Sequence, residues 1–191
     1  IKGRMEEAWS DGLDVIAATE HLSIRVVPDT EGLPTPESAK IKRSKAATKA
    51  VESATKIAEN FGLLVIPGVE LTGDAKTQGH FNSLFTTDNS VLYDYDAMQA
   101  IRNARQQGAL IMHNHPGWRH STLEMTKFEK AAYAEGLVDG IELMNGAYFY
   151  PRAFNTAEEH KLFMTSNTDI HATTAQQYRE NGHLRNMTII F

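Results

Sequence analysis

The sequence contains no cysteine, which excludes disulfide bridges and metal sites built on thiolates. Any transition metal in this protein would therefore be held by imidazole nitrogen and carboxylate oxygen. Long apolar runs are missing as well, since the longest, Leu63 to Ile66, is far shorter than the roughly 20 residues of a membrane-spanning helix. We expect no membrane-spanning segment.

An excess of positive charge is also absent. The formal net charge of the 191 residues is -5, which argues against binding to nucleic acids other than a small nucleotide, but leaves room for a local cationic pocket. Hydrophobic residues make up 41% and charged residues 23%, as in ordinary globular proteins. A chain of this length can form one sizeable core, so we expect a single domain over residues 1–191.

Short apolar runs alternate with longer stretches of helical period, the pattern of an α/β fold with a mainly parallel sheet or barrel. The predicted strands are Asp14 to Thr19, Leu63 to Pro67, Asn82 to Thr86, Ala109 to His113, Gly140 to Met144, Leu162 to Thr165 and Met187 to Phe191. The predicted helices are Ser44 to Asn60, Asp94 to Gln107, Thr126 to Glu135 and Pro151 to His160.

Glycines and prolines mark the ends of these elements. Gly62, Gly108 and Gly136 stand where a left-handed residue would end a helix. The proline-rich stretch Val26 to Glu37 is interpreted as a loop. In the first predicted helix, the buried stripe is predicted to be Ala46, Ala50, Ala54 and Ile57.

Ionisable residues gather at the ends of the predicted strands. They are His21, Glu70, His80, His115, Glu142, Asp169 and His171. The carboxyl ends of parallel strands share one face, so these residues should converge there. Imidazoles and carboxylates together suit zinc, manganese or iron better than calcium. The group therefore predicts a metal site, whereas each residue taken singly would as readily close a loop or cap a helix.

Five short motifs contain most of these residues. They are Thr19-Glu20-His21, Pro67-Gly68-Val69-Glu70, Gly79-His80-Phe81-Asn82, His115-Pro116-Gly117-Trp118 and Thr168-Asp169-Ile170-His171. Together and in this order they resemble successive motifs of the polymerase and histidinol phosphatase (PHP) superfamily, and in particular its stand-alone bacterial metal-dependent phosphoesterases. The resemblance implies a distorted (β/α)7 barrel, similar to a TIM barrel, with two or three divalent ions (Zn, Mn or Fe) at its carboxyl face.

The resemblance also implies a role for each matching residue. Glu70 would bridge two metals, and His80 with His115 would complete the ligands of one of them. Asp169 would join the bridging carboxylate on the second metal. The first of these two ligand sets is whole, whereas the second is short of ligands.

The third metal would be held by His21 and His171, and the family pattern includes further ligand residues that this chain lacks. It opens with a His-x-His on the first strand, followed by a ligand in a Ser-Asp-Gly-like stretch, but no histidine precedes His21. Asp11 stands in such a stretch just before the first predicted strand, and is interpreted as a turn residue between helix and strand. We expect the barrel's first strand to be missing from this chain and to be supplied by a preceding segment, which leaves Glu70, His80 and His115 as the residues to remain converged.

Other residues are given supporting roles. His113 shares the side of an extended strand with His115, and is expected to orient ligands or to line the pocket, with direct ligation as the alternative. Glu142 and Asn145, in a segment that resembles a recurrent one of the family, are expected to orient ligands. The histidines outside any motif, expected at the surface, are His120, His160 and His183.

Two basic features remain. Arg119 follows the His115 motif, and its guanidinium would bind a phosphate through two parallel hydrogen bonds, with an ordinary exposed arginine as the alternative. Arg119 and His21 are the candidate catalytic residues. The cluster Lys40, Lys42, Arg43, Lys45 and Lys49 is interpreted as the solvated face of a helix rather than a nucleic-acid site, with Arg43 also placed to line the substrate entrance.

The predicted reaction is hydrolysis of a mono- or diester of a small phosphorylated substrate by a metal-bound hydroxide. Coordination lowers the pKa of water from about 15.7 to about 7, so no covalent nucleophile is required. Two alternatives stay open. One is a metal-dependent amidohydrolase, which the Pro-Gly-Val-Glu motif disfavours, and the other is a non-catalytic metal- or ligand-binding barrel domain, which the missing opening motif favours.

Overall fold

The structure of the protein is a computed structural model that describes residues 1–24, 36–120, 124–179, 182 and 185–190, with the backbone alone for 36–42 and 179. Its helices are α1 (Lys2–Ser10), α2 (Pro36–Ala58), α3 (Ala97–Gln106), α4 (Lys127–Ala134) and α5 (Arg152–His160), with shorter turns η1 (Glu59–Phe61), η2 (Asn89–Val91) and the π-helical η3 (Ala175–Arg179). Its strands are β1 (Val15–Ala18), β2 (His21–Ser23), β3 (Leu64–Thr72), β4 (His80–Leu84), β5 (Leu110–Asn114), β6 (Gly140–Asn145), β7 (Tyr148–Phe149) and β8 (Phe163–Asn167).

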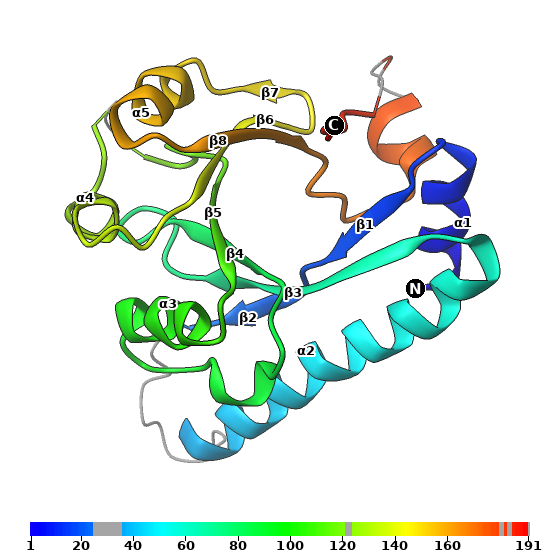
Figure 1. The fold of residues 1–191 in the computed structure, drawn as a ribbon, viewed down its shortest axis with the longest axis horizontal. Helices are drawn as coiled ribbons and strands as arrows, with labels where there is room; N and C mark the ends of the chain where they lie inside the picture. The colour runs from blue at the N-terminus through cyan, green and yellow to red at the C-terminus, as the bar shows by residue number, and fades with distance from the viewer. Residues whose placement is uncertain (25–35, 121–123, 180–181, 183–184, 191) are drawn as a thin grey trace.

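The strands form one curled sheet that resembles part of a distorted barrel (Figure 1). β1 and β2 both run parallel to β3 and keep one register, since Ala18 pairs with Pro67 and His21 with Glu70. β4 runs antiparallel between β3 and β5, whereas β6 runs parallel to β5 and to β8. The α/β class is confirmed, but the sheet is mixed rather than mainly parallel. The connection 73–79 between β3 and β4 is too short for a parallel crossover, which needs a dozen or more residues.

The direction of β4 decides where its first residue lies. His80 pairs with Thr72 at the end of β3 and with Asn114 at the end of β5. A histidine at the start of its own strand is thereby placed at the carboxyl ends of the neighbouring strands. All the strand ends that carry candidate ligands consequently lie at the same end of the sheet.

Two apolar clusters hold the fold together. The larger one joins the inner residues of the sheet to α2, α3, α4 and α5, and includes the fully buried Leu22, Val69, Ile111 and Ile141. The smaller one lies where Met5 and Ala8 of α1 meet α2 and the start of β3. Because α1 buries so few residues, its apolar pattern is weak, and the sequence did not predict this helix.

Several predicted boundaries need correction. The sequence missed the short strands β2 and β7, and residues 187–190 form no strand, although Thr188 bonds to the backbone of Ser166 in β8. The predicted loop Val26 to Glu37 lies outside the described residues except for its last two, with which α2 begins. No helix in the described ranges has the length and apolar character needed to cross a bilayer.

The buried stripe of α2 is also shifted from its predicted position. The helix buries Ser44, Ala47, Ala54 and Ala58, whereas Ala46 is exposed and Ala50 only half-buried. Alanines occur on several faces of this helix, so their spacing alone could not select the buried one. The left-handed conformation predicted for Gly62, Gly108 and Gly136 is confirmed, with φ values of 67°, 80° and 66°.

Gly68 in β3 provides a test of how tightly the mixed sheet is packed. A Cβ atom there would lie 2.6 Å from the backbone oxygen of Ser83 in β4, so Gly68→Ala must push the two strands apart. We expect the free energy of unfolding in urea to fall by about 1–3 kcal/mol, the usual cost of overpacking.

Gly3→Ala is the matched control, because a Cβ atom at Gly3 of α1 meets no atom within 4 Å. It should leave stability unchanged or raise it by about 0.5–1 kcal/mol, since alanine favours a helix more than glycine does. Equal urea midpoints for Gly68→Ala and the wild type would contradict the close approach of β3 and β4.

Candidate metal centre

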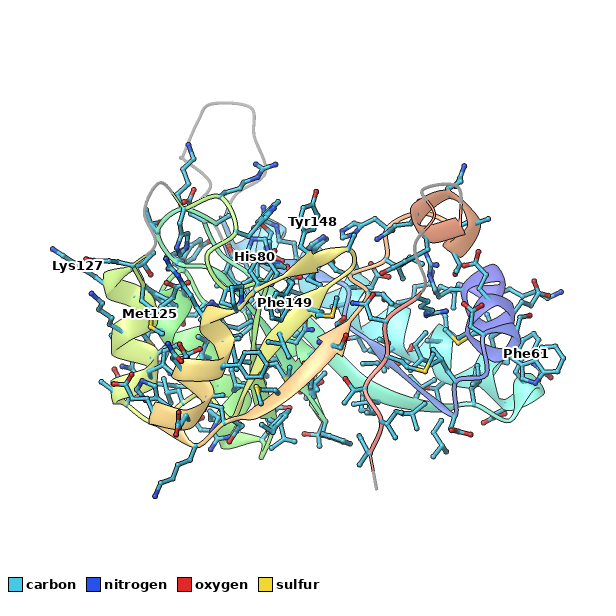
Figure 2. All side chains as sticks on the ribbon, turned by 90° about the horizontal axis from the view of Figure 1, so that it is seen from above. Phe61, His80, Met125, Lys127, Tyr148 and Phe149 are labelled. Carbon is cyan, nitrogen blue, oxygen red and sulfur yellow. The ribbon has the colours of Figure 1, made fainter. Side chains whose placement is uncertain are left out.

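Three buried side chains from neighbouring strands form the centre of the site. Glu70 on β3, His80 on β4 and His115 just after β5 place their ligand atoms within 4.8 Å of one another. Their exposed fractions are 4%, 5% and 6%, so water reaches none of them freely. Figure 2 shows His80 on the same side of the molecule as Tyr148 and far from Phe61, which lies next to α1. The structure thus brings together the three residues expected to remain converged.

Glu70 is a buried carboxylate with partners from several strands. Its Oε1 lies 3.0 Å from Nδ1 of His21 and 3.1 Å from Nδ1 of His80, and it accepts a hydrogen bond of 2.8 Å from the Thr72 hydroxyl. Burial raises the pKa of Glu70, but the hydrogen bonds and charges of His21 and His80 outweigh it and hold the pKa far below its ordinary value. Glu70 is therefore a carboxylate anion at neutral pH.

Two properties of the histidines fit a metal ligand. Nε2 of His80 is buried and has no hydrogen-bond partner among the described residues, which costs about 1–3 kcal/mol unless another group satisfies it. Burial, reinforced by the nearby His80, lowers the pKa of His115 to about 4, so this imidazole is neutral at pH 7. Metal ligation requires a neutral imidazole and an ionised carboxylate, and this group of side chains supplies both.

His21, Asp169 and His171 extend the cluster toward solvent. Nε2 of His21 lies 3.1 Å from Nε2 of His171, and Nδ1 of His171 lies 3.5 Å from Oδ1 of Asp169. The His21 and His171 side chains are 49% and 62% exposed. All six predicted ligand residues thus form one continuous chain of contacts, with Glu70, His80 and His115 buried and His21, Asp169 and His171 more exposed.

Backbone strain is concentrated at this site. Among the described residues, the non-glycine positions with positive φ are Phe85, His115, Arg119, Lys161 and Asp169. Three of these five are predicted site residues, and such conformations cost about 1–3 kcal/mol each unless the surroundings hold them. Strain of this kind is typical of functional sites.

Glu142 holds the strained backbone of His115. Its Oε2 accepts a hydrogen bond of 2.6 Å from the His115 amide and one of 2.9 Å from Asn145, while its Oε1 accepts one of 2.9 Å from Asn167. Burial raises the pKa of Glu142 to about 7, although these hydrogen bonds favour its charged form. Glu142 thus contacts the candidate ligand His115 through its backbone amide, and its role in orienting ligands stays a prediction.

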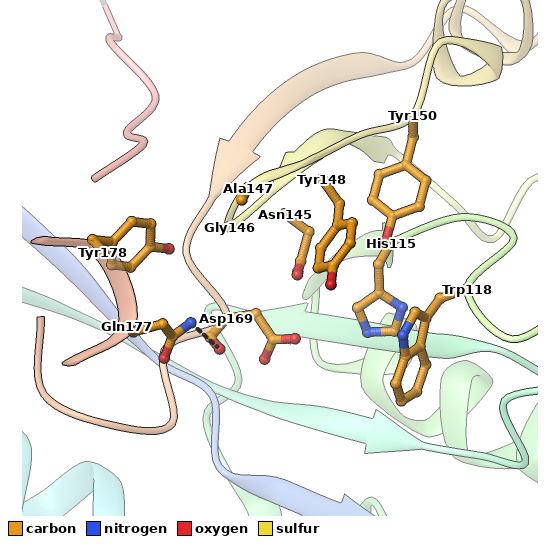
Figure 3. Close-up of a pocket in the computed structure, with 10 residues that line it drawn as sticks. All are labelled: His115, Trp118, Asn145, Gly146, Ala147, Tyr148, Tyr150, Asp169, Gln177 and Tyr178. Carbon is orange, nitrogen blue, oxygen red and sulfur yellow. Dashed lines mark hydrogen bonds between the residues drawn. The ribbon is translucent and has the colours of Figure 1, made fainter. Parts of the chain in front are cut away.

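A cavity of about 530 Å³ opens beside the candidate metal ligands (Figure 3). His115 and Asp169 point toward it, Trp118 and Tyr150 line one side, and Tyr178 lies on the other. This is large enough for a small ligand.

The predicted phosphate-binding arginine lies near this cavity. The guanidinium of Arg119 stacks 4.4 Å over the Trp118 ring, and that ring contacts His115 and His80 with centroids 5.1 and 5.6 Å away. Arg43 instead donates a 2.6 Å hydrogen bond to the Ser23 carbonyl and lies against the Tyr93 ring.

Lys45 and Lys49 are exposed, as expected of a solvated face, and the side chains of Lys40 and Lys42 lie outside the described residues, as does His183.

His113 and His120 meet at a buried glutamate that the sequence analysis did not single out. Nε2 of His113 lies 3.0 Å from Oε1 of Glu129, and Nδ1 lies 2.7 Å from the Tyr133 hydroxyl. The His120 side chain is 5% exposed and its Nε2 lies 3.6 Å from the same glutamate oxygen, so its predicted surface position is wrong. His160 is half-buried, because its ring stacks on Tyr133. The only sequence signal for Glu129 was the capping box that it forms with Thr126 at the start of α4. A capping box explains this glutamate as a helix cap and does not indicate its contacts with the two histidines.

Comparison with known proteins gives two informative structures. No family model and no curated protein sequence matches the chain. A two-domain protein from Bacteroides vulgatus that contains a predicted PHP-like metal-dependent phosphoesterase aligns over 97% of this chain with 31% identity and a TM-score of 0.76. This chain spans about half of that protein, 52% of its length.

The second structure is a proposed metal-dependent phosphoesterase from Bifidobacterium adolescentis. It aligns over 97% of this chain and 85% of its own, with 15% identity and a TM-score of 0.60, and so supports the fold alone. Taken with the convergence of Glu70, His80 and His115 and the order of the five motifs, the likeness to the Bacteroides protein shows that this chain belongs to the PHP superfamily.

Proposed function

We propose that this protein is a metal-dependent phosphoesterase that hydrolyses a small phosphate mono- or diester. The observation that carries the proposal is the convergence of Glu70, His80 and His115 beside a cavity of about 530 Å³. Capping or loop closure does not require a buried carboxylate to share its oxygen with two imidazoles. The similar Bacteroides protein, which contains a predicted metal-dependent phosphoesterase, supports the same reaction class.

The proposed metal ligands are the six residues of the contact chain. Glu70, His80 and His115 would hold one ion, and Glu70 with Asp169 would hold the second. His21 and His171 would belong to a third. Four imidazoles and two carboxylates favour Zn, Mn or Fe over Ca and Mg, which prefer oxygen ligands. The proposed architecture is a distorted (β/α)7 barrel in which residues 1–191 act as one catalytic domain.

The protein's own residues would bind and orient the substrate. When bound, divalent ions supply an activated water and offset the negative charge of the reacting phosphate oxygens. Arg119 would bind two phosphate oxygens through its planar guanidinium, held in place by its stacking on Trp118. The carboxylate of Glu70 is oriented by the Thr72 hydroxyl, and the His115 backbone is fixed by Glu142. His21 contacts both halves of the site and remains the second candidate catalytic residue.

The reaction class is tested with p-nitrophenyl phosphate and bis-p-nitrophenyl phosphate, each with Mn²⁺ or Zn²⁺ and after chelation. We expect metal-dependent release of nitrophenol from at least one ester. Hydrolysis of amide substrates alone would favour an amidohydrolase. Tight metal binding without any turnover would favour a non-catalytic domain.

Removal of a central ligand should abolish both metal binding and hydrolysis. For His115→Ala and Glu70→Ala we expect metal content to fall and kcat/KM to drop by more than about 100-fold, beyond the 10–100-fold typical of residues that only orient ligands. In the wild type, metal at 100 times its Kd should add about 2.7 kcal/mol to the free energy of unfolding, and this gain should vanish in both variants.

His160→Ala is the matched control, since it removes a half-buried imidazole outside the six residues. It should keep its metal and its activity. Wild-type turnover by His115→Ala would refute the proposed centre.

Arg119→Lys keeps the positive charge but loses the planar fork that matches two phosphate oxygens. We expect kcat/KM to fall about tenfold, equivalent to about 1.4 kcal/mol of transition-state stabilisation, and inhibition by inorganic phosphate to weaken. Arg102→Lys serves as the control, because Arg102 forms an exposed ion pair with Glu135. If Arg119→Lys and Arg102→Lys give equal kinetics and equal phosphate inhibition, Arg119 does not bind the substrate.

A further inference from the structure

We propose that Gln177, together with Arg4 and Glu7 of α1, positions the loop that carries Asp169 and His171 and so sets the metal affinity of the exposed half of the centre. The inference rests on the proposed metal centre. Its residues lie outside the five motifs, and they act through the backbone of the loop rather than by ligation.

The two halves of the centre are built in different ways. Glu70 and His80 lie in paired strands, where backbone hydrogen bonds on both sides fix their positions. Asp169 and His171 follow the end of β8, in residues 168–174 that pair with no strand. The side chains of Asp169 and His171 are 31% and 62% exposed, so burial does not fix them either. Other contacts must hold this loop.

Gln177 uses one side-chain amide to hold both ends of the ligand-bearing segment. Its Oε1 accepts hydrogen bonds from the backbone amides of His171 and Ala172, at 2.9 and 3.3 Å. Its Nε2 donates longer bonds of 3.4 Å to the carbonyls of Thr168 and Asp169, the second of which is drawn in Figure 3. Asp169 has a left-handed φ of 46°, which an aspartate adopts only at a cost, and these bonds fix that conformation.

Helix α1 holds the far end of the same loop. Arg4 donates a 2.7 Å hydrogen bond to the Ala172 carbonyl, and Glu7 accepts one of 2.8 Å from the Thr174 amide. The two side chains also pair with each other at 2.8 Å. Figures 1 and 2 both show α1 next to η3, the turn that contains Gln177. The helix is itself anchored through Met5 and Ala8 in the smaller apolar cluster.

This brace predicts a selective effect on metal binding. Loosening the loop should weaken binding of the two ions that Asp169 and His171 would help to hold, and leave the ion at Glu70, His80 and His115 in place. Residues that orient metal ligands typically contribute 10–100-fold to metal affinity, and we expect an effect of this size. If α1 merely stabilised the fold, substitutions in it would lower the free energy of unfolding without changing the number of bound ions.

The experiment measures bound Mn²⁺ and Zn²⁺ by equilibrium dialysis and elemental analysis. We expect Glu7→Ala and Gln177→Ala to lose one or two ions per chain at a free metal concentration that saturates the wild type, or to bind them 10–100-fold more weakly. Glu7→Gln should restore binding, because the glutamine oxygen can still accept the Thr174 amide. Glu6→Ala is the control on the same helix, since Glu6 is half-exposed and pairs only with the neighbouring Lys2 among the described contacts.

Hydrogen exchange of the 168–174 amides gives a second readout that needs neither metal nor activity. Exchange should be faster in Glu7→Ala than in the wild type and in Glu7→Gln. If Gln177→Ala fails to fold, the comparison of Glu7→Ala with Glu7→Gln still tests whether α1 positions the loop. Unchanged metal number, affinity and exchange in Glu7→Ala would overturn the proposal. A wild type that binds its ions but hydrolyses no ester would refute the proposed function and leave the brace standing.

Discussion

The site depends on one physical constraint, the need to keep the charge of Glu70 paired where water hardly reaches it. A buried carboxylate without partners would take up a proton rather than stay ionised. Glu70 avoids this because its partners come from four strands, namely Thr72 from its own strand, His80 from β4, His21 from β2 and Asn114 from β5. The register of the sheet is therefore tied to the site. A slip of one residue in β4 would turn the His80 side chain to the other face and leave the carboxylate short of a partner.

The same constraint explains why β4 must run against its neighbours. The sequence correctly suggested that His80 belongs with Glu70 and His115, yet in a parallel sheet the start of β4 would lie at the opposite end from theirs. The seven residues 73–79 between β3 and β4 determine the direction of β4, because so short a connection can only make a hairpin. The predicted strands ended at Pro67 and began at Asn82, and the connection 68–81 between them looked long enough for a parallel crossover, so the sequence did not predict the direction of β4.

The contacts that sequence could not predict are those between distant, ordinary residues. Five motifs located all six predicted ligand residues, because each stands beside a turn at a strand end. Arg4 and Ala172, by contrast, lie 168 positions apart and belong to no motif. Their contact depends on α1, whose weak apolar pattern did not mark it as a helix, and on a loop whose path only the folded chain defines. The same holds for His120, which looks like a surface histidine until Glu129 is seen beside it.

The two halves of the centre differ in what holds their strained backbones. At His115 the left-handed conformation is fixed by Glu142, a carboxylate with 1% exposure that also accepts hydrogen bonds from the side-chain amides of Asn145 and Asn167. At Asp169 the corresponding bonds come from Gln177, a half-buried side chain outside the sheet. Hydrogen bonds shielded from water are stronger and cost more to break than exposed ones. The buried half should therefore keep its geometry through most substitutions at the surface, whereas the loop with Asp169 and His171 depends on a few side chains of α1 and η3.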